Sequence, residues 1–317
     1  MTGLKLAALF IIHKNIKQAE RLLRFFHRET AECFVHIDRK YSCNFENVRR
    51  HLESQENVHV LDERLSGTLA DWSLVKITML LVQSASRYGQ KNSIHFAYYG
   101  LFSGQDYPIK PWRQFQEALE QSYPLNFLDI WKHGEIHVGN KFAKYRFWKV
   151  QNFLYSNVRN CFFRKALKVP VYLLEKAVTV IWKTPEIRLK EMGIGLYEGS
   201  AWWILSDGII GFILGEWEKR ANYLKVISNT STPEESFFQI LAMKSPYRDF
   251  IRKGDYKHIY CNFTPFGKPA MGHPYDITIE DLERGGVMQT PFFFARKFDF
   301  ARYPETLSWI DNALMSK

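Results

Sequence analysis

Two adjacent carboxylates, Glu234 and Glu235, stand where the chain changes from polar to apolar residues. They belong to the run Thr232-Pro-Glu-Glu-Ser-Phe-Phe238, in which the proline favours the first turn of a helix. A carboxylate held at the start of a helix is ionised and positioned, so Glu235 is a candidate general base that removes a proton from a hydroxyl. The same run has the spacing of a capping box, from Thr232 to Glu235, and the local sequence alone favours that structural interpretation.

Two adjacent cations, Arg296 and Lys297, follow an apolar run close to the last residues of the sequence. At the end of a strand such a pair could bind a diphosphate, because guanidinium and ammonium groups donate charge-assisted hydrogen bonds to phosphate oxygens. Lys257 is a third cation that fits this role. A solvated charge pair is the alternative interpretation of Arg296 and Lys297.

Apolar patterns predict the elements that must position these residues. Residues 16–28 have the spacing of apolar positions that is typical of a helix, and further helices are expected at 45–52 and 72–88. The alternation of strand and helix predicts an α/β fold with a doubly wound, mostly parallel central sheet and helices on both faces. Strands are expected at residues 6–12, 32–38, 57–62, 94–102, 195–205 and 256–261, and before Arg296.

Polar side chains follow several of these predicted strands. Ligands of such sheets bind at the carboxyl ends of the strands, and Asp38 and Asp62 end the second and third of them. Ser103 and Asp106 lie in the loop after the fourth predicted strand, on the same expected edge. A turn-forming role before Pro108 is an equal alternative for Asp106.

Two adjacent tryptophans, Trp202 and Trp203, lie in the strand predicted at 195–205. Because successive side chains of a strand face opposite sides, at most one of the two can reach a site. Packing in the core is the favoured alternative for each.

Composition restricts the classes of protein to which the chain can belong. Its 317 residues, 46% hydrophobic and 16% aromatic, suffice for one large or two small globular domains. The four cysteines form no C-x-x-C pair, so neither a disulfide framework nor a zinc site is indicated, and a reducing compartment is expected. No apolar run is long enough to span a bilayer, and the sequence contains no P-loop, nucleophile elbow or G-x-G-x-x-G.

The positive charge of the chain is concentrated in residues 141–190. This segment contains twelve Lys/Arg, two Glu and ten aromatic residues, and its net charge of +10 equals that of the whole chain. We expect a helical insertion that contacts an anionic surface, either a membrane or a nucleic acid. A lid with aromatic side chains packed inward and solvated Lys/Arg is an equal alternative.

Five blocks, in the same order along the chain, resemble the motifs of one glycosyltransferase family. This family comprises the core-2/I-branching β-1,6-N-acetylglucosaminyltransferases and the peptide O-xylosyltransferases. The last two blocks look closer to the xylosyltransferase branch. The blocks are Glu32-Cys-Phe-Val-His-Ile-Asp-Arg-Lys40, Leu101-Phe-Ser-Gly-Gln-Asp-Tyr-Pro-Ile-Lys110, Gly199-Ser-Ala-Trp-Trp-Ile-Leu-Ser206, Thr232-Pro-Glu-Glu-Ser-Phe-Phe238 and Phe293-Phe-Ala-Arg-Lys-Phe-Asp299.

The resemblance implies a single GT-A-like domain over residues 1–317 and an inverting, metal-independent transferase with a UDP-sugar donor. Residues 1–135 would form the nucleotide-binding half and residues 195–317 the acceptor and catalytic half. The expected acceptor is a hydroxyl of a glycan or of a lipid-linked saccharide, and the new linkage is β. No cofactor is expected. The sequence lacks the Asp-x-Asp pair with which many such transferases hold a divalent ion, so cations would neutralise the departing diphosphate.

The resemblance also assigns roles to residues. Glu235 matches the general base of the family, and Glu234 its less constrained neighbour on the acceptor side. Arg296 and Lys297 match the basic pair at the donor diphosphate, and Lys257 falls near another family cation. The donor side is expected to include His36, Ile37 and Asp38 by resemblance, and Asp62, Ser103 and Asp106 by their places at strand ends. The acceptor side is expected to include Gly199, Ser200, Trp202 and Trp203.

One departure from the family leaves the sugar open. The family commonly has Trp-Gly-Gly-x-Ser before its third helix, whereas the run Leu69-Ala-Asp-Trp-Ser73 keeps only the Trp and the Ser. We therefore expect a sugar of the GlcNAc or xylose class, with a different nucleotide sugar as the closest alternative.

Location and partners follow from the same comparison. Eukaryotic members carry an N-terminal membrane anchor and disulfides, whereas this chain begins at its first predicted strand and has few cysteines. A bacterial, cytoplasmic member is therefore expected, in peripheral contact with an anionic membrane through residues 141–190. A nucleic-acid-binding protein, suggested by the pI of about 9.3, is the alternative from another class. Because no RNP-like or zinc pattern accompanies that charge, we expect no nucleic-acid partner.

Overall fold

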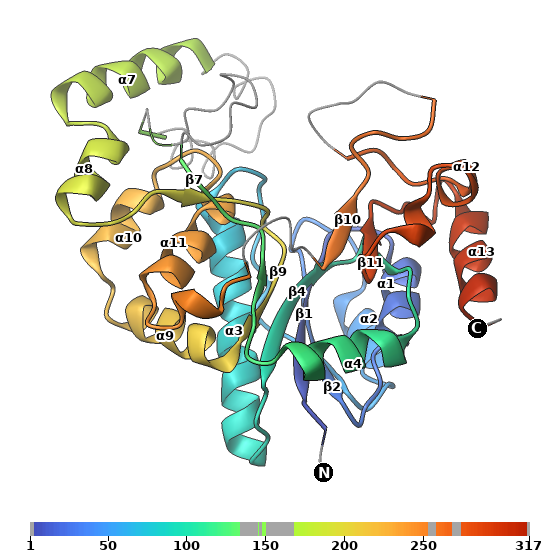
Figure 1. Cartoon of the computed structure of the whole chain (residues 1–317). Helices are drawn as coiled ribbons and strands as arrows, with labels where there is room; N and C mark the ends of the chain where they lie inside the picture. Colours follow the sequence, from blue (N-terminus) through green and yellow to red (C-terminus); the bar gives the residue numbers. More distant parts are fainter. Residues whose placement is uncertain are drawn as a thin grey trace.

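The computed structural model describes residues 3–133, 145, 148–149, 168–252, 258–267 and 274–315. Its centre is a six-stranded sheet (Figure 1). The doubly wound, mostly parallel sheet predicted from the sequence is confirmed, since four neighbouring strands are parallel and β9 alone runs antiparallel to both of its neighbours. Across the sheet the strands are β3 (Val58–Val60), β2 (Ala31–Ile37), β1 (Leu6–Ile12), β4 (Tyr98–Ser103), β9 (Trp203–Ser206) and β6 (Phe127–Leu128).

Helices cover both faces of this sheet, which explains why β1 is a continuous apolar run. Alternate side chains of β1 enter two separate clusters, so that Phe10 packs on one face and Leu9 on the other. A strand covered on both sides has no solvated face and needs no polar positions. The first cluster includes residues of α1 (Ile16–Leu23), α2 (Phe45–Leu52), α4 (Trp112–Ser122), α12 (Ile279–Glu283) and α13 (Pro304–Met315). The second includes residues of α3 (Trp72–Asn92), α9 (Asp207–Glu218), α10 (Asn222–Ile227) and α11 (Phe237–Lys244).

A second, three-stranded sheet connects the last part of the chain to the loop after β4. Its strands are β10 (Ile259–Cys261), β11 (Phe294–Arg296) and β5 (Tyr107–Pro108). Ala295 of β11 pairs with Tyr107 of β5. This register carries Arg296 to the loop that contains Ser103 and Asp106.

The strand predicted at 195–205 is interrupted. It forms β8 (Tyr197–Glu198), which pairs with β7 (Trp131–Lys132), and then β9. Between them the chain passes very close to Asp129, since a Cβ on Gly199 would lie 1.8 Å from the carbonyl oxygen of Asp129. The N–H of Gly199 donates to the carbonyl oxygen of Glu235 at 2.9 Å. Backbone contacts with two other segments therefore replace strand pairing here.

The helix predicted from Thr232 begins as a 3₁₀ turn, η1 (Pro233–Glu235), and continues as α11. Thr232 has a φ of 50°, and its side chain makes no capping hydrogen bond. The capping-box interpretation of this run is therefore wrong, and the two glutamates are not explained by capping.

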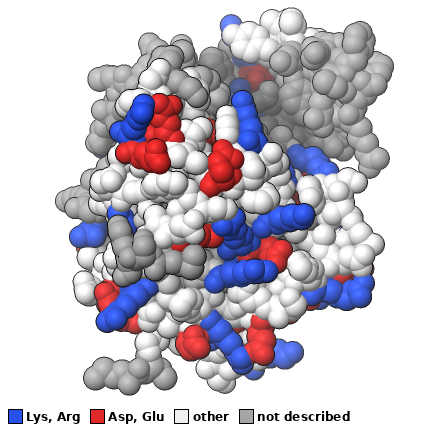
Figure 2. Space-filling model, turned by 90° about the vertical axis from the view of Figure 1, so that its right-hand side faces the viewer, with Lys and Arg blue, Asp and Glu red and all other residues white. Residues whose placement is uncertain are grey.

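Only part of the basic segment 141–190 lies within the described residues. Its described helices are α7 (Lys168–Ile181) and α8 (Pro185–Glu191), as expected for a helical insertion. Among the described residues no helix combines the length and the apolar character needed to cross a membrane. On the face shown in Figure 2, basic and acidic side chains are interspersed and form no field of one sign. The remaining short turns are η2 (Arg248–Phe250) and η3 (Val287–Gln289).

Candidate active site

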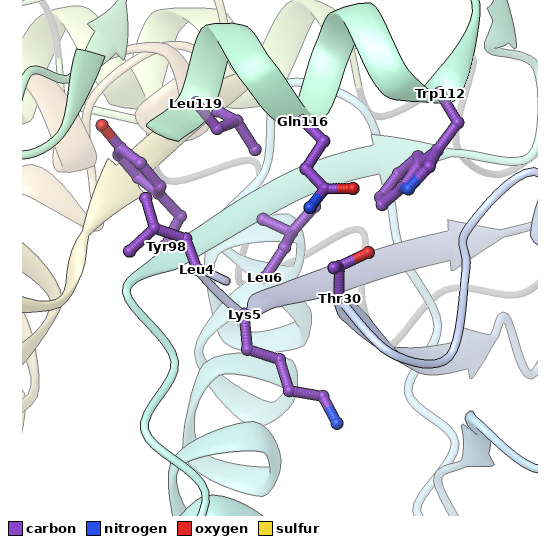
Figure 3. Close-up of a pocket in the computed structure, with 8 residues that line it drawn as sticks. All are labelled: Leu4, Lys5, Leu6, Thr30, Tyr98, Trp112, Gln116 and Leu119. Carbon is purple, nitrogen blue, oxygen red and sulfur yellow. The ribbon is translucent and has the colours of Figure 1, made fainter. Parts of the chain in front are cut away.

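Two hollows at opposite ends of β1 differ greatly in size. Figure 3 shows the small one, which is lined by Leu6 at the start of β1, by Leu4 and Lys5 just before it, and by Trp112 and Gln116 of α4; the Lys5 side chain points away from α4. Its volume is about 10 Å³. A space of this size holds at most about one water molecule, so it cannot accept a substrate.

The larger hollow lies at the carboxyl ends of β1, β2 and β4 and has a volume of about 700 Å³. This volume is within the range of about 300–1,000 Å³ that is typical of small-molecule sites. The chain passes from β1 to β2 and β3 on one side and then crosses to β4 on the other side of β1, so the strand order reverses at this point. The cavity therefore occupies the position where open α/β sheets bind ligands. Its walls include His13, Asp38, Lys40, Tyr41, Gly67, Leu69, Ser103, Gln105, Ala201, Trp202, Glu234, Phe238, Arg296 and Lys297.

Arg296 is held in the wall of this cavity by three different contacts. Its Nε lies 3.5 Å from a carboxylate oxygen of Asp106, and its Nη2 donates to the hydroxyl of Ser103 at 3.5 Å. Its guanidinium carbon lies 3.9 Å from the centre of the Trp202 ring. A planar cation between a carboxylate and an aromatic face has little freedom to rotate.

Asp106 is fully buried, and this burial raises its pKa although Arg296 and the N–H of Ser103 favour the carboxylate. The Ser103 N–H donates to Asp106 at 2.7 Å. Asp106 therefore lies behind the cavity wall, where it orients the guanidinium of Arg296 and does not reach a ligand.

The guanidinium of Arg296, which lines the cavity, does not use all of its hydrogen-bonding capacity within the described part of the protein. Arg296 is only 7% exposed, and its Nη1 is buried without a hydrogen-bond partner among the described residues. The next residue, Lys297, also lines the cavity, and burial together with the nearby Arg296 lowers its pKa. Two cations that the fold does not neutralise completely give this wall an affinity for anions.

Asp38 organises another part of the cavity wall. Its carboxylate accepts the N–H of Lys40 at 2.7 Å and the N–H of Gly67 at 2.8 Å. It thereby ties the loop after β2 to the loop that precedes α3. Beneath it, buried His36 accepts the N–H of Leu65 at 2.9 Å, and burial lowers the pKa of His36 to about 4. His36 is therefore neutral and positions this loop.

The two candidate carboxylates of η1 occupy different environments. Glu234 is 6% exposed, lines the cavity and accepts the N–H of Ala70 at 2.8 Å. Glu235 is half-buried and does not belong to the cavity wall, and its backbone is fixed by Gly199. Both residues have further interactions within the protein. Glu234 therefore lines the cavity, whereas its neighbour Glu235 does not.

Six of the residues predicted from the sequence meet at the cavity. They are Asp38, Ser103, Trp202, Glu234, Arg296 and Lys297. They come from five separate places in the chain and converge because parallel strands share one carboxyl edge and because β11 pairs with β5.

Other predicted residues lie outside the cavity wall. Ile37 is in the core, and Trp203 is fully buried with its ring 4.7 Å from that of Phe238. The alternation of Trp202 and Trp203 across the strand explains why only Trp202 reaches the cavity. Gly199 and Ser200 lie behind it against Asp129, and the carbonyl of Ser200 accepts the side chain of Gln239 at 2.7 Å.

Asp62 was predicted at the binding edge but the structure places it elsewhere. Its carboxylate pairs with Arg49 of α2 and borders a separate hollow of about 340 Å³. The short strand β3 ends before the cavity begins, which separates Asp62 from Asp38. Lys257 lies outside the described residues.

The cavity also contains residues that the sequence reasoning did not single out, among them His13, Tyr41 and Gln105. His13 follows β1 directly, as Asp38 follows β2, so the same strand-end signal could have found it. Burial and the neighbouring Lys14 lower its pKa. Within the described ranges, no three His, Cys, Asp or Glu side chains are grouped in a way that could hold a metal ion.

The mostly parallel sheet with helices on both faces, and the cavity at its switch point, are those of a GT-A-like fold. The chain belongs to the family described as Core-2/I-Branching enzyme, whose match extends over residues 6–284.

Curated relatives of this chain include two kinds of xylosyltransferase. Xylosyltransferase 1 of Rattus norvegicus is 22% identical over 329 residues, which cover 98% of this chain and 35% of the relative. Xylosyltransferase 2 of Mus musculus is 22% identical over 326 residues, which cover 97% of this chain and 33% of the relative. The chain therefore spans about a third of the length of these relatives.

Proposed function

We propose that this chain transfers a sugar of the GlcNAc or xylose class from a UDP-sugar to a glycan hydroxyl, with inversion, and without a divalent metal ion. The observation that carries the proposal is the guanidinium of Arg296, fixed by Asp106, Ser103 and Trp202 in the wall of a cavity of about 700 Å³. A buried cation that faces a cavity of nucleotide-sugar size supports the binding of a diphosphate.

The donor would lie with its diphosphate against Arg296 and Lys297 and its nucleoside toward the rim formed by Asp38. As the bond from the anomeric carbon to the diphosphate breaks, negative charge develops on the UDP oxygen. Cations already oriented toward that oxygen stabilise the charge without reorganisation. This arrangement replaces the divalent ion of metal-dependent transferases.

The acceptor hydroxyl would attack the anomeric carbon from the face opposite UDP, which gives a β-linkage. Its oxygen forms the new bond to that carbon and its proton passes to Glu235, the general base that the resemblance implies. Glu234, on the cavity wall, would contact the acceptor sugar. The closeness of both glutamates to the cavity supports a base in η1.

Glutamine variants of the two glutamates test this assignment. Loss of a general base lowers turnover by about 10²–10⁴-fold. Glu235→Gln should therefore bind UDP as the wild type does, but the rate at which it releases UDP from the UDP-sugar should fall by this factor. Glu234→Gln is the matched control. Its activity should fall less, mainly because the KM for the acceptor rises. Turnover of Glu235→Gln at the wild-type level would reject Glu235 as the base.

A thermal-shift panel tests the donor and the absence of a metal requirement. UDP, UDP-GlcNAc and UDP-xylose should stabilise the chain, with and without EDTA, whereas GDP and CDP should not. Stabilisation that requires Mg²⁺ or Mn²⁺ would reject metal independence. A larger shift with another nucleotide would assign a different nucleotide sugar.

The acceptor that we propose is a glycan or a lipid-linked saccharide in polysaccharide biosynthesis, and the location is the cytoplasm. The thiols of Cys33 and Cys43 form no disulfide within the described part of the chain, which supports a reducing compartment. Transfer to a lipid-linked saccharide in vitro, with analysis of the product linkage, would test the acceptor.

A further inference from the structure

The helix α7 exposes apolar side chains along most of its surface. Val180 is 86% exposed and Ile181 is 74% exposed, and Trp182, which follows the helix, is 60% exposed. Val169, Tyr172, Leu173 and Leu174 are exposed as well. Monomeric proteins rarely leave such a contiguous apolar surface in water without a binding role.

The buried side of α7 contains a charged residue. Glu175 is only 4% exposed, and its carboxylate lies 3.6 Å from Nζ of Lys149. On the same side, the hydroxyl of Thr179 donates to the carbonyl of Glu175 at 2.6 Å. A surface helix that only stabilises the fold buries its apolar side and exposes its charges. Apart from Val171, which is 4% exposed, the buried side of α7 is polar, and most of its apolar side chains lie outside. This distribution indicates that the outer face has another partner.

The orientation of α7 is fixed at its C-terminal end. Nε1 of Trp148 donates to the carbonyls of Trp182 and Lys183, each at 2.9 Å. The following helix α8 begins with a capping hydrogen bond from the N–H of Ile187 to the hydroxyl of Thr184 at 3.2 Å. The exposed face is therefore part of a packed helical corner.

Cations surround this apolar face. Lys176, Lys183, Arg188 and Lys190 are all exposed, and Lys183 and Lys190 also pair with Glu191 and Glu186, respectively. Nζ of Lys176 lies 4.8 Å from the centre of the Tyr172 ring. The whole segment 141–190 has a net charge of +10. Apolar and aromatic side chains beside Lys and Arg are typical of helices that lie in the interface of an anionic bilayer.

The length and place of α7 agree with this interpretation. Its 14 residues extend about 21 Å at 1.5 Å per residue, which is shorter than the hydrocarbon core of a bilayer. In Figure 1, α7 lies at the end of the molecule toward which the carboxyl ends of β1 and β4 point. A membrane on α7 would therefore lie on the same side as the cavity.

We propose that α7 docks the chain on a bilayer that contains anionic phospholipid. Val180, Ile181 and Trp182 enter the headgroup region, while Lys176 and Lys183 contact lipid phosphates. Charge complementarity favours this partner over a second copy of the chain, because two copies joined through α7 would bring like charges together.

Vesicle flotation tests the proposal with the full chain. The chain should float with vesicles of phosphatidylcholine and phosphatidylglycerol, and much less with vesicles of phosphatidylcholine alone. Each Lys near an anionic surface contributes about five-fold in affinity, so Lys176→Gln with Lys183→Gln should weaken binding about 25-fold. High salt should also weaken binding to the anionic vesicles, because it screens the attraction between lysine and phosphate.

Apolar variants separate insertion from simple charge attraction. Val180→Ser with Ile181→Ser should lower lipid affinity by at least about ten-fold, because both side chains lose their apolar contact with lipid. The matched control is Phe250→Ser in η2, whose side chain is 42% exposed and lies outside α7 and α8. This control should bind lipid like the wild type, and all variants should keep the melting temperature.

Two results would overturn the proposal. One is a wild-type chain that does not float with anionic vesicles or floats equally well after the α7 substitutions. The other is a dimer in sedimentation analysis that Val180→Ser with Ile181→Ser converts to a monomer, because α7 would then bind a second copy. Flotation requires no catalysis, so its outcome is independent of the proposed transferase activity.

Discussion

Replacing Arg296 by lysine tests whether the geometry of this cation, as well as its charge, binds the donor. The guanidinium contacts Asp106, Ser103 and the Trp202 ring at the same time, and its Nη1 is buried without a hydrogen-bond partner among the described residues. A lysine ammonium is a point charge and cannot make these contacts together. Arg296→Lys should therefore keep the positive charge of the wall and lose its oriented hydrogen bond to the diphosphate.

The size of the effect follows from the number of bonds lost. One hydrogen bond to a charged group contributes about 1.5–3 kcal/mol, which corresponds to about a 10- to 150-fold change in Kd. Isothermal titration with UDP should show a loss in this range for Arg296→Lys. Titration with uridine should show little change, because the nucleoside lacks the phosphates that this cation contacts.

Arg302→Lys is the matched control for this experiment. The side chain of Arg302 is 68% exposed and lies 3.4 Å from a carboxylate oxygen of Asp276. Exposed ion pairs contribute about 0–1 kcal/mol, so this change should leave UDP affinity unaltered. Two results would refute this role of Arg296. One is an Arg296→Lys variant that binds UDP as tightly as the wild type, and the other is a loss of affinity that is equally large for uridine and for UDP.

Three further predictions concern the cavity and the segment behind it. Because burial lowers the pKa of Lys297 below 10.5, UDP affinity should fall at alkaline pH before an ordinary lysine deprotonates, and Lys297→Arg should move that loss to higher pH in the same titration. Trp202→Leu removes the ring over the guanidinium and should weaken UDP binding about two- to thirty-fold; an unchanged Kd would contradict the stacking role. Gly199→Ala should destabilise the chain by about 3 kcal/mol or more in chemical denaturation, because its Cβ would lie 1.8 Å from a backbone oxygen of Asp129. Gly211→Ala, where a Cβ meets nothing within 4 Å, is the control and should stabilise α9 by about 0.5–1 kcal/mol.

Much of the fold could be predicted because burial leaves a clear pattern in the sequence. The apolar run of β1 and the alternation of strands and helices follow from a sheet covered on both faces. The interruption at Gly199 could not be predicted, since it depends on the close approach of Asp129, 70 positions earlier in the chain. The residue at which each strand ends could not be predicted either. The strand expected at 57–62 ends at Val60, and Asp62 beyond it pairs with Arg49 and does not reach the cavity.

Which side chains share the site depended on contacts between distant segments. Ser103 and Arg296 are 193 positions apart, and only the pairing of β11 with β5 brings them together. Because successive side chains of a strand face opposite sides, the sequence predicted that at most one of Trp202 and Trp203 reaches the cavity. It did not indicate which of the two. The 3₁₀ turn decided that Glu234 lines the cavity and that Glu235 lies beside it, because side-chain direction in a turn depends on backbone angles that residue types alone do not specify.

The sequence by itself determined the fold class, the family motifs and the residue types at the edge where parallel strands end, because apolar periodicity and strand polarity act locally. Only the tertiary structure decided that Asp106 supports Arg296 from behind, that Trp202 covers it, and that α7 turns its apolar side outward. These features depend on packing between segments far apart in the chain, and that packing sets the burial and direction of each side chain.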